Sequence, residues 1–324
     1  MLLGEPLLLG VLLLALALDG LFGDPDAIWR RLPHPAVLFG RLINRVDTQY
    51  NDPGSDDGTR RERGFAFVTI LCAVTLFLGH AVEVIVLALP FGTLLLAALA
   101  STLIAQKSLF EHVREVARAL DRGGVEGGRE AVRHIVGRDP ESLDEAGISR
   151  ASIESCAENF SDGVVAPVFW FVVFGFGGLL AYKAVNTADS MIGHRTPRHE
   201  AFGWAAARLD DLLNWVPARL SGALIAGASG LAGGKPEIAF KVMVEDASKH
   251  RSPNAGWPEA AMAAALGVAL AGPRTYGDET VNDAWMNEKG RNAATASDIR
   301  RGLKIFIGAC LLNAGLIGLL WVLL

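Results

Sequence analysis

Three acidic residues recur at every fourth position in one polar segment: Glu154, Glu158 and Asp162. On a helix these residues share one face, where like charges at this spacing repel each other by a few tenths of a kcal/mol. A hard cation bridging carboxylates and nucleotide phosphates relieves such repulsion, and Mg²⁺ takes only one or two carboxylates together with phosphate oxygens. A solvated acidic stripe is the alternative. The spacing therefore indicates either a metal site or a plain surface helix.

A second polar run follows directly after an apolar block. On a helix Lys183, Asn186 and Ser190 share one face, and Asp189 lies beside them. Ionisable groups at membrane depth are costly and usually face a cavity. This run, together with Arg195 farther on, therefore predicts a polar site. The alternative is that Lys183 extends to the membrane interface as a simple anchor.

The segment before the next apolar block repeats this pattern. Arg208, Asp211 and Asn214 stand at i, i+3 and i+6, with Asp210 adjacent and Arg219 further along. This spacing is typical of an ion pair within one helix, here Arg208 with Asp211. A second metal or phosphate site is the other interpretation.

A basic cluster precedes a turn near the end of the chain. Lys249–Arg251 lead into the turn Ser252–Gly256, and we expect a helix to begin at Pro258 with Glu259 in its first turn. Basic side chains beside exposed backbone N–H groups can hold an anion. A simple linker is the alternative.

The first polar loop holds two further candidates, Asp24 and His34. Gly and Pro residues around them fix turns at the membrane edge. The structural interpretation is that Asp24 caps a helix beginning at Pro25.

The composition indicates what kind of protein carries these segments. The chain has 324 residues, a net charge of −5, 51% hydrophobic residues and 36 glycines. It is more apolar than an average soluble domain, which excludes a disordered chain. It has no basic excess for binding nucleic acid. The three cysteines form no CxxC pair, which excludes a disulfide scaffold and a thiolate zinc site.

Six apolar blocks are candidates for membrane crossings, each of which takes about 20 helical residues. We expect spans at residues 6–22, 65–85, 88–106, 164–185, 212–234 and 303–324. Arg-rich segments after the first, third and fifth spans predict cytoplasmic polar loops in a multi-pass protein of the inner membrane. Residues 186–211 are too basic for an outer loop. The two spans flanking that segment are therefore either re-entrant or return it through a polar cavity.

The remaining sequence is helical in pattern, with no convincing alternation of strand type. We therefore predict a single all-α polytopic membrane domain, a helical bundle with helical cytoplasmic loops. The glycines of Gly175–Gly178 lie inside an apolar helix, where they predict close helix packing rather than dinucleotide binding. The residues alone are typical of a membrane enzyme or a transporter.

In their order along the chain, these segments resemble the CobD/CbiB family of cobalamin biosynthesis, the adenosylcobinamide-phosphate synthases. The matching segments are residues 19–25 with 34–35, 135–139, 154–167, 182–191, 208–219 and 252–259. The resemblance implies an integral membrane enzyme that joins adenosylcobyric acid to (R)-1-amino-2-propanol O-phosphate. It also implies ATP as the driver of amide formation and Mg²⁺ as the expected metal.

The polar segments match what this reaction needs, and we expect each to serve it. As metal ligands we expect Glu154, Glu158, Asp162, Asp210 and Asp211. As catalytic residues we expect Lys183, Asp189 and Arg208, with His34 or His250 as the base. As residues that bind substrate or nucleotide we expect Asp24, Asn159, Asn186, Ser190, Arg195, Asn214, Arg219, Lys249, Arg251, Ser252, Asn254, Trp257 and Glu259.

Two other functions fit the same segments. Broken helices with ionisable groups also form transporter sites, which makes a corrinoid transporter one alternative. An inverted repeat would favour transport, and the sequence shows none. The other alternative is a scaffold that docks further late corrin-pathway enzymes at the lipid bilayer.

Overall fold

The computed structural model describes residues 5–23, 29, 33–135, 140–276, 279–281 and 283–324. The chain folds into two compact units, each assembled from segments that are far apart in the sequence. The first unit comprises Met1–Ala105, Ala166–Asn214 and Ile317–Leu324. The second comprises Gln106–Val165 and Trp215–Leu316. Helices dominate both units, as expected for an all-α protein.

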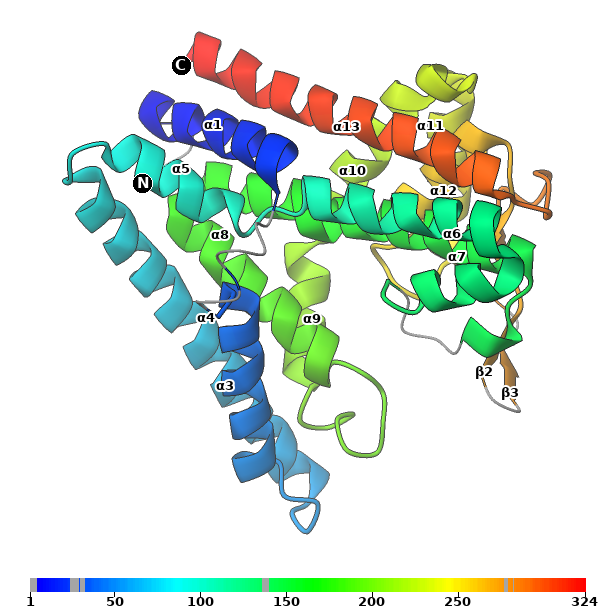
Figure 1. The fold of residues 1–324 in the computed structure, drawn as a ribbon. Helices are drawn as coiled ribbons and strands as arrows, with labels where there is room; N and C mark the ends of the chain where they lie inside the picture. The colour runs from blue at the N-terminus through cyan, green and yellow to red at the C-terminus, as the bar shows by residue number, and fades with distance from the viewer. Residues whose placement is uncertain (1–4, 24–28, 30–32, 136–139, 277–278, 282) are drawn as a thin grey trace. The chain divides into compact units, whose positions relative to one another are not determined.

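The described residues of the first unit are almost entirely helical (Figure 1). Its helices are α1 (Pro6–Phe22), α3 (Pro35–Tyr50), α4 (Asp57–Leu87), α5 (Gly92–Ser101), α8 (Ala166–Ile192), α9 (Trp204–Leu213) and the last residues of α13 (Ala296–Leu323). A turn at residues 88–91 joins α4 to α5. Phe91 adopts a left-handed conformation there, with φ of 60°.

Helices α4 and α8 lie side by side, and glycines let them approach closely (Figure 1). A Cβ added to Gly79 would lie 2.6 Å from the Cα of Gly177. This confirms the close packing expected for the glycine run. Helix α8 is kinked at Gly175, with φ of 65°, and Glu83 of α4 accepts the N–H of Phe176 at 2.7 Å. A buried carboxylate thus satisfies a backbone donor released by the kink.

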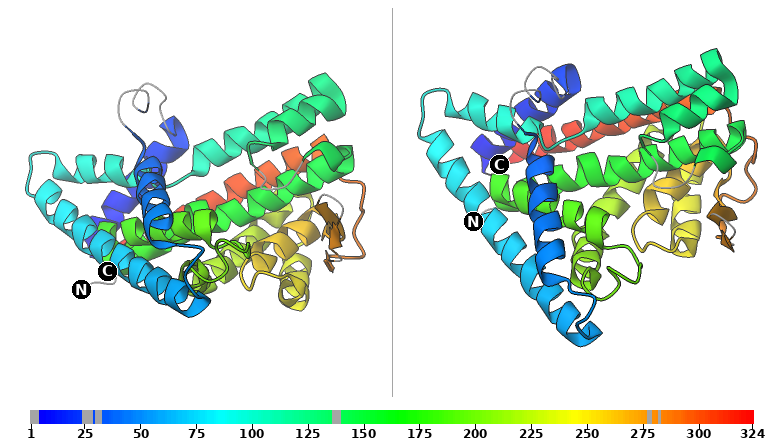
Figure 2. Two further views of the ribbon diagram at one scale, coloured as in Figure 1. Left: turned by 90° about the horizontal axis from the view of Figure 1, so that it is seen from below. Right: turned by 60° about the horizontal axis from the view of Figure 1, so that its bottom comes forward.

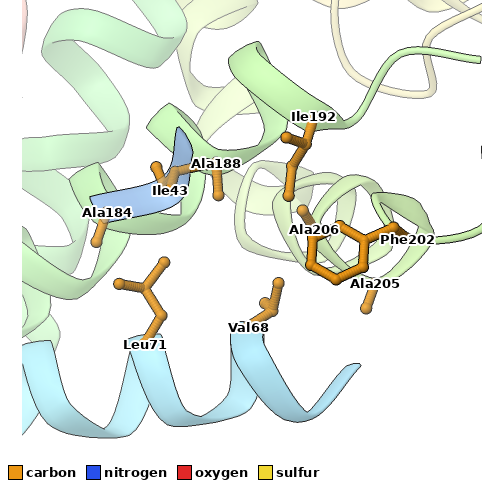
Figure 3. Close-up of a cluster of buried hydrophobic side chains, with 9 residues drawn as sticks. All are labelled: Ile43, Val68, Leu71, Ala184, Ala188, Ile192, Phe202, Ala205 and Ala206. Atoms are coloured by element: carbon orange, nitrogen blue, oxygen red, sulfur yellow. The ribbon is translucent and has the colours of Figure 1, made fainter. Parts of the chain in front are cut away.

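A hydrophobic cluster holds α8 and α9 in fixed register (Figure 3). Small residues of α8 leave room for the fully buried ring of Phe202, which lies two residues before the start of α9. The members of the cluster are Ile43, Val68, Leu71, Ala184, Ala188, Ile192, Phe202, Ala205 and Ala206. The polar residues of α8 and α9 are positioned by this packing.

A polar network fixes the loop between α8 and α9. Asp47 of α3 pairs with Arg198 at 2.7 Å, and Asn51 donates to the backbone oxygen of Arg198 at 2.9 Å. Arg60 of α4 donates to the side-chain oxygen of Asn51 at 2.9 Å. Burial alone would raise the pKa of Asp47, but hydrogen bonds from Asn51 and Arg198 outweigh it and lower that pKa.

The second unit combines long helices, short helical turns and two short antiparallel strand pairs, β1 with β4 and β2 with β3. Its helices are α6 (Gln106–Val132), α7 (Glu145–Phe160), α10 (Trp215–Ala228), α11 (Pro236–Asp246), α12 (Gly256–Leu266) and most of α13. Its shorter helical segments are η1 (Pro140–Ser142), the π-helix η2 (Ser161–Val165), η3 (Ser229–Ala232) and η4 (Ala247–Lys249). Its strands are β1 (Leu270–Ala271), β2 (Arg274–Tyr276), β3 (Glu279–Val281) and β4 (Trp285–Met286). Strands of two or three residues are too short to show in the sequence as alternation, which is why no strand was expected.

Helix α12 contacts several other elements of this unit (Figure 2). It packs against α7, α10 and α11, while α10 also packs against η2. A Cβ added to Gly222 of α10 would lie 2.9 Å from the backbone oxygen of Trp257. This close approach brings together the elements that carry the acidic segment, Arg219 and the basic cluster.

Among the described residues, four helical stretches are long and apolar enough to cross a membrane: Asp57–Leu87, Gly92–Val132, Glu145–Ile192 and Ala296–Leu323. The predicted spans 65–85, 88–106, 164–185 and 303–324 fall largely or wholly within them. Helix α1, predicted as span 6–22, is a shorter apolar helix of 17 residues. In the predicted span 212–234, α10 has 14 residues and passes into η3. The number of complete crossings stays a prediction.

Candidate functional site

Two of the predicted polar segments meet in the first unit. Asn186 of α8 donates from Nδ2 to one carboxylate oxygen of Asp210 on α9, at 3.2 Å. Asn214, at the end of α9, donates to the other oxygen of Asp210 at 2.9 Å and accepts from the Tyr182 hydroxyl at 3.0 Å. We name as the α8–α9 cluster the residues Tyr182, Asn186, Asp189, Asp210, Asp211 and Asn214.

The electrostatics of the α8–α9 cluster are dominated by Asp210, which is only 8% exposed. Burial, followed by the negative charge of Asp189, raises the pKa of Asp210 to about 7. Hydrogen bonds from Asn186 and Asn214 oppose this shift only in part. Near neutral pH both the charged and the neutral forms of the Asp210 carboxyl group are therefore populated. A cation placed beside it would favour the charged form.

Two arginines flank the cluster on its exposed side. Arg208 pairs with Asp211 at 2.9 Å, as the helical spacing predicted. Burial raises the pKa of Asp211, while the charges of Arg208 and Arg195 oppose the rise. Because the side chain of Arg208 is 51% exposed, its guanidinium remains accessible to an anionic ligand.

The other candidates of the first unit occupy more ordinary positions. Lys183 is half-buried on α8, and the exposed Ser190 donates to the backbone oxygen of Asn186 at 2.9 Å. His34 caps α3, because its Nδ1 accepts the N–H of Ala36 at 3.1 Å. Its Nε2 lies 3.1 Å from the backbone oxygen of Thr102. These contacts give His34 a structural role at the start of α3.

In the second unit, the turn before α12 is built around His250. Its Nδ1 lies 3.0 Å from the N of Ser252 and 3.4 Å from the O of Ser252, so this nitrogen has a partner in either tautomer. Its Nε2 lies 3.7 Å from a carboxylate oxygen of the buried Glu259. The Ser252 hydroxyl in turn accepts the N–H groups of Asn254 and Ala255, each at 3.2 Å. We name residues 249–259 the α12 entrance.

The two outer cations of the α12 entrance are paired with carboxylates. Lys249 contacts Asp246 at 2.6 Å, and Arg251 contacts Asp283 at 3.1 Å. Asp246 is held in place because it also accepts the N–H of Asn287 at 2.7 Å. The sequence predicted an anion site at these cations, and the structure shows them engaged in partly exposed ion pairs.

Arg219 of α10 lies between two tryptophan rings. Its guanidinium carbon is 4.2 Å from the ring centroid of Trp215 and 4.4 Å from that of Trp257. One of its nitrogens donates to the backbone oxygen of Trp215 at 2.6 Å. Such stacking fixes a planar cation in orientation while its other N–H groups stay available. Trp215 was missed from the sequence, although an aromatic residue four positions before Arg219 is a usable signal.

The three acidic residues of the segment 154–162 lie in different environments. Glu154 is buried in α7 and accepts the N–H of Ala271 at 2.8 Å, which ties β1 to the helix. Glu158 is exposed, and Asn159 donates to the backbone oxygen of Ser155 at 2.9 Å. Asp162 lies in the π-helix η2, a type of distortion that is frequent at functional sites.

The metal site expected from the sequence stays a prediction. Within the described part of the chain, no group of three or more His, Cys, Asp or Glu residues is arranged to hold a metal ion. Mg²⁺ bound together with phosphates needs fewer carboxylates than that. Asp24, predicted to bind substrate or cap a helix, lies outside the described residues. Tyr182 was missed as a member of the α8–α9 cluster, although a hydroxyl in an apolar helix needs a partner.

The fold and these sites define an all-α polytopic membrane protein with a buried carboxylate cluster in one unit and an aromatic-stacked arginine in the other. The model of the family described as CobD/Cbib protein matches residues 12–306. This chain belongs to that family.

Relatives match over nearly their whole length. The chain is 50% identical over 310 residues to a protein named cobalamin biosynthesis protein CobD from a Sinorhizobium species, covering 95% of this chain and 96% of the relative. It is 49% identical to a protein of the same name from Brucella suis, covering 95% of each. It is 45% identical to one from Rhodobacter capsulatus, covering 96% of this chain and 98% of the relative. No solved structure matches the chain.

Proposed function

We propose that this protein acts in cobalamin biosynthesis as an ATP-dependent amide ligase of the membrane. Its substrates would be adenosylcobyric acid and (R)-1-amino-2-propanol O-phosphate, and its product adenosylcobinamide phosphate. The family match and the names of the relatives support a place in cobalamin biosynthesis. The particular reaction, an amide ligation, is proposed from the chemistry of the polar residues.

The reaction needs two kinds of assistance from the protein. A carboxylate oxygen of the corrinoid attacks the γ-phosphorus of ATP, ADP leaves, and an acyl phosphate forms. The neutral amine then attacks the acyl carbon, phosphate leaves with the electrons of the C–O bond, and the nitrogen gives its proton to a base. The first step needs charge stabilisation around phosphate, and the second needs a proton acceptor.

The α8–α9 cluster is the observation that carries the proposal. Its carboxylates disfavour one another's charged forms, and Arg208 and Arg195 border it. Phosphoryl transfer is catalysed by such combinations of cations and metal-holding carboxylates. In this proposal Arg208, Arg195 and Lys183 hold the phosphates of ATP.

Mg²⁺ fits the donor set of the cluster. Asp210 has a pKa raised by burial and by Asp189, so a bound dication would stabilise the charged form that the protein alone disfavours. Asp210 and Asp211 would hold the ion, which would neutralise charge on the phosphates of ATP. Asn186 and Asn214 orient the carboxylate of Asp210 through their amide groups.

The α12 entrance fits the amine substrate. In the tautomer whose Nδ1 proton faces the Ser252 oxygen, Nε2 of His250 is the atom that would take the proton of the amine. Glu259, at 3.7 Å from that nitrogen, stabilises the resulting charge. Arg219, Lys249 and Arg251 bind the phosphate of the substrate, the last two by exchanging carboxylate partners for phosphate. We place this chemistry on the cytoplasmic side of the inner membrane, following the arginine distribution of the loops.

Product formation by the full chain in membranes tests the ligase. Wild-type membranes supplied with adenosylcobyric acid, aminopropanol phosphate, Mg²⁺ and ATP should yield a corrinoid heavier by one aminopropyl phosphate less water. Product should be absent without ATP. Failure of a folded, corrinoid-binding protein to make this product would favour the transporter or the docking scaffold.

Site variants test the residues. Asp211→Asn should lower the rate, as should Glu158→Gln and Asp162→Asn, because the sequence predicts these two carboxylates as further metal ligands. Glu245→Gln is a matched control, because Glu245 is exposed and pairs only loosely with Lys241 at 3.8 Å. Full activity in the first three variants, at equal membrane expression, would refute the assigned metal and phosphate sites.

A further inference from the structure

A groove in the second unit has no part in the proposed reaction. It is lined by residues of α6 and α13 and has a volume of about 310 Å³. On α6 the groove residues follow a helical spacing from Phe110 through Arg114 to Asp121, and on α13 they run from Arg300 to Ile307. The periodic spacing means that one face of each helix lines the groove.

The rim of the groove is positively charged. Arg114, Arg118, Arg300 and Lys304 line it against a single carboxylate, Asp121. Asp121 pairs with Arg300 at 2.7 Å. The contacts of Arg114 and Arg118 with glutamates of their own helix are long, at 3.9 Å and 3.8 Å.

Two of these cations have bonding capacity left over. The Nε atom of Arg114 is buried without a hydrogen-bond partner among the described residues, and a buried donor left unpaired is costly. Within the same described set, no carboxylate forms an ion pair with Lys304, which is exposed. The groove therefore offers a buried N–H donor and an ammonium group to an anion.

The groove changes from charged to apolar along α13. Leu303 and Phe110 contribute apolar surface beside the cations. One and two turns beyond Lys304 follow Ile307 and Leu311, which are 45% and 68% exposed. Helix α13 is one of the four stretches able to cross a membrane. A ligand lying along this face would meet cations first and an exposed apolar surface next.

We propose that this groove binds an anionic phospholipid, with its phosphate between Arg114 and Lys304 and an acyl chain along Ile307 and Leu311. The order of charged and apolar surface matches the order of head group and tail, and basic pockets between membrane helices bind such head groups. A soluble phosphate would leave the apolar part uncovered. A second copy of the chain would place like charges against each other.

Competitive lipid retention tests the site on the full chain in detergent. Native mass spectrometry after incubation with equal amounts of phosphatidylglycerol and phosphatidylcholine should show preferential retention of phosphatidylglycerol. The double variant Arg114→Gln, Lys304→Gln should lower that retention by about 30-fold, roughly fivefold for each cation removed. The matched variant Lys241→Gln, Lys289→Gln removes the same charge from exposed positions outside the groove and should retain the lipid.

Three results would overturn the proposal: equal retention of both lipids, equal loss in the matched variant, or displacement of the lipid by glycerol 3-phosphate at equal concentration. The last result would identify a site for a soluble anion. Photo-cross-linking of a reactive phosphatidylglycerol to the wild-type protein needs no variant to fold. Adducts on α6 and on the first half of α13 would support the site, and adducts confined to other helices would refute it.

Discussion

The α8–α9 cluster and the α12 entrance differ in how their charged groups are paired. In the α8–α9 cluster, carboxylates accumulate beside amide donors, and the pKa of Asp210 rises to about 7. At the α12 entrance, charged groups stand in opposite-sign pairs, among them Lys249 with Asp246 and Arg251 with Asp283. The charge of the first region would be balanced by a bound cation, whereas the second region is already paired within the protein. This difference is the reason why the proposed function gives metal-assisted phosphoryl chemistry to the first region and substrate binding to the second.

Removal of the central carboxylate should have the largest effect. We expect Asp210→Asn to lower ligase turnover by at least about 10³-fold, because both the proposed metal ligand and its charge are lost. The size of the side chain is preserved, and Asn186 and Asn214 remain beside it. Steady-state rates at saturating substrates measure the effect, and Glu245→Gln serves as control. A turnover within tenfold of wild type would remove the cluster from the mechanism.

The same variant should stabilise the folded protein at high pH. A carboxyl with a pKa near 7 when folded and 3.8 when exposed binds more protons in the folded state between those values. The free energy of unfolding therefore falls as pH rises from about 4 to about 7, by at most about 4 kcal/mol. We expect Asp210→Asn to unfold at a higher temperature than wild type at pH 8 and to lose most of that advantage at pH 4.5.

Thermal unfolding in detergent without Mg²⁺ at the two pH values measures this effect. A variant that is less stable than wild type at pH 8 would show that Asp210 is a structural group. Loss of activity combined with gain of stability is the signature of a residue kept for function.

The stacked arginine allows a test of the second region. Arg219→Lys keeps the charge but loses the planar group held between Trp215 and Trp257. We expect KM for aminopropanol phosphate to rise about tenfold, since stacking and fixed N–H geometry contribute about 1–2 kcal/mol. The KM for ATP should stay unchanged. An equal rise in both constants would contradict the assignment of separate tasks to the two regions.

The sequence predicted the elements better than the contacts between them. Helical spacing located the Arg208–Asp211 pair, and the glycines of α8 indicated close helix packing, although only the structure shows α4 as the partner. These features depend on local periodicity. The bond from Asn186 to Asp210 joins residues 24 positions apart and depends on the packing around Phe202.

Other contacts could not be read from local patterns at all. Glu154 looked equivalent to Glu158, yet it is buried and bound to the N–H of Ala271, 117 positions away. The partner of Arg251, Asp283, lies beyond α12 in sequence. Spacing along the sequence predicts the helix face on which a charged residue lies, but it does not identify the distant residue that neutralises that charge.

A smaller effect is expected at Asp47, a carboxylate of the first unit with the opposite pKa shift. Burial raises the pKa of Asp47, but hydrogen bonds from Asn51 and Arg198 outweigh this effect. The pKa of Asp47 in the folded protein is therefore lowered. Its contribution to stability is therefore fully present above the unfolded value of 3.8 and is lost as pH falls through the lower folded value. Because Arg198 is 45% exposed, solvent screening limits the contribution to about 1 kcal/mol or less.

Asp47→Asn should accordingly lower the unfolding temperature by a few degrees at pH 7, with a shrinking difference as pH falls below 4. Its pH dependence is thus opposite to that of Asp210→Asn, although both carboxylates belong to the same unit. The pair of variants compares two little-exposed carboxylates of one unit that differ in depth of burial and in the charges beside them. If both variants shifted stability in the same direction at pH 7 to 8, the accumulated charge of the α8–α9 cluster would not explain its behaviour, and the contrast between the two polar regions would lose its physical basis.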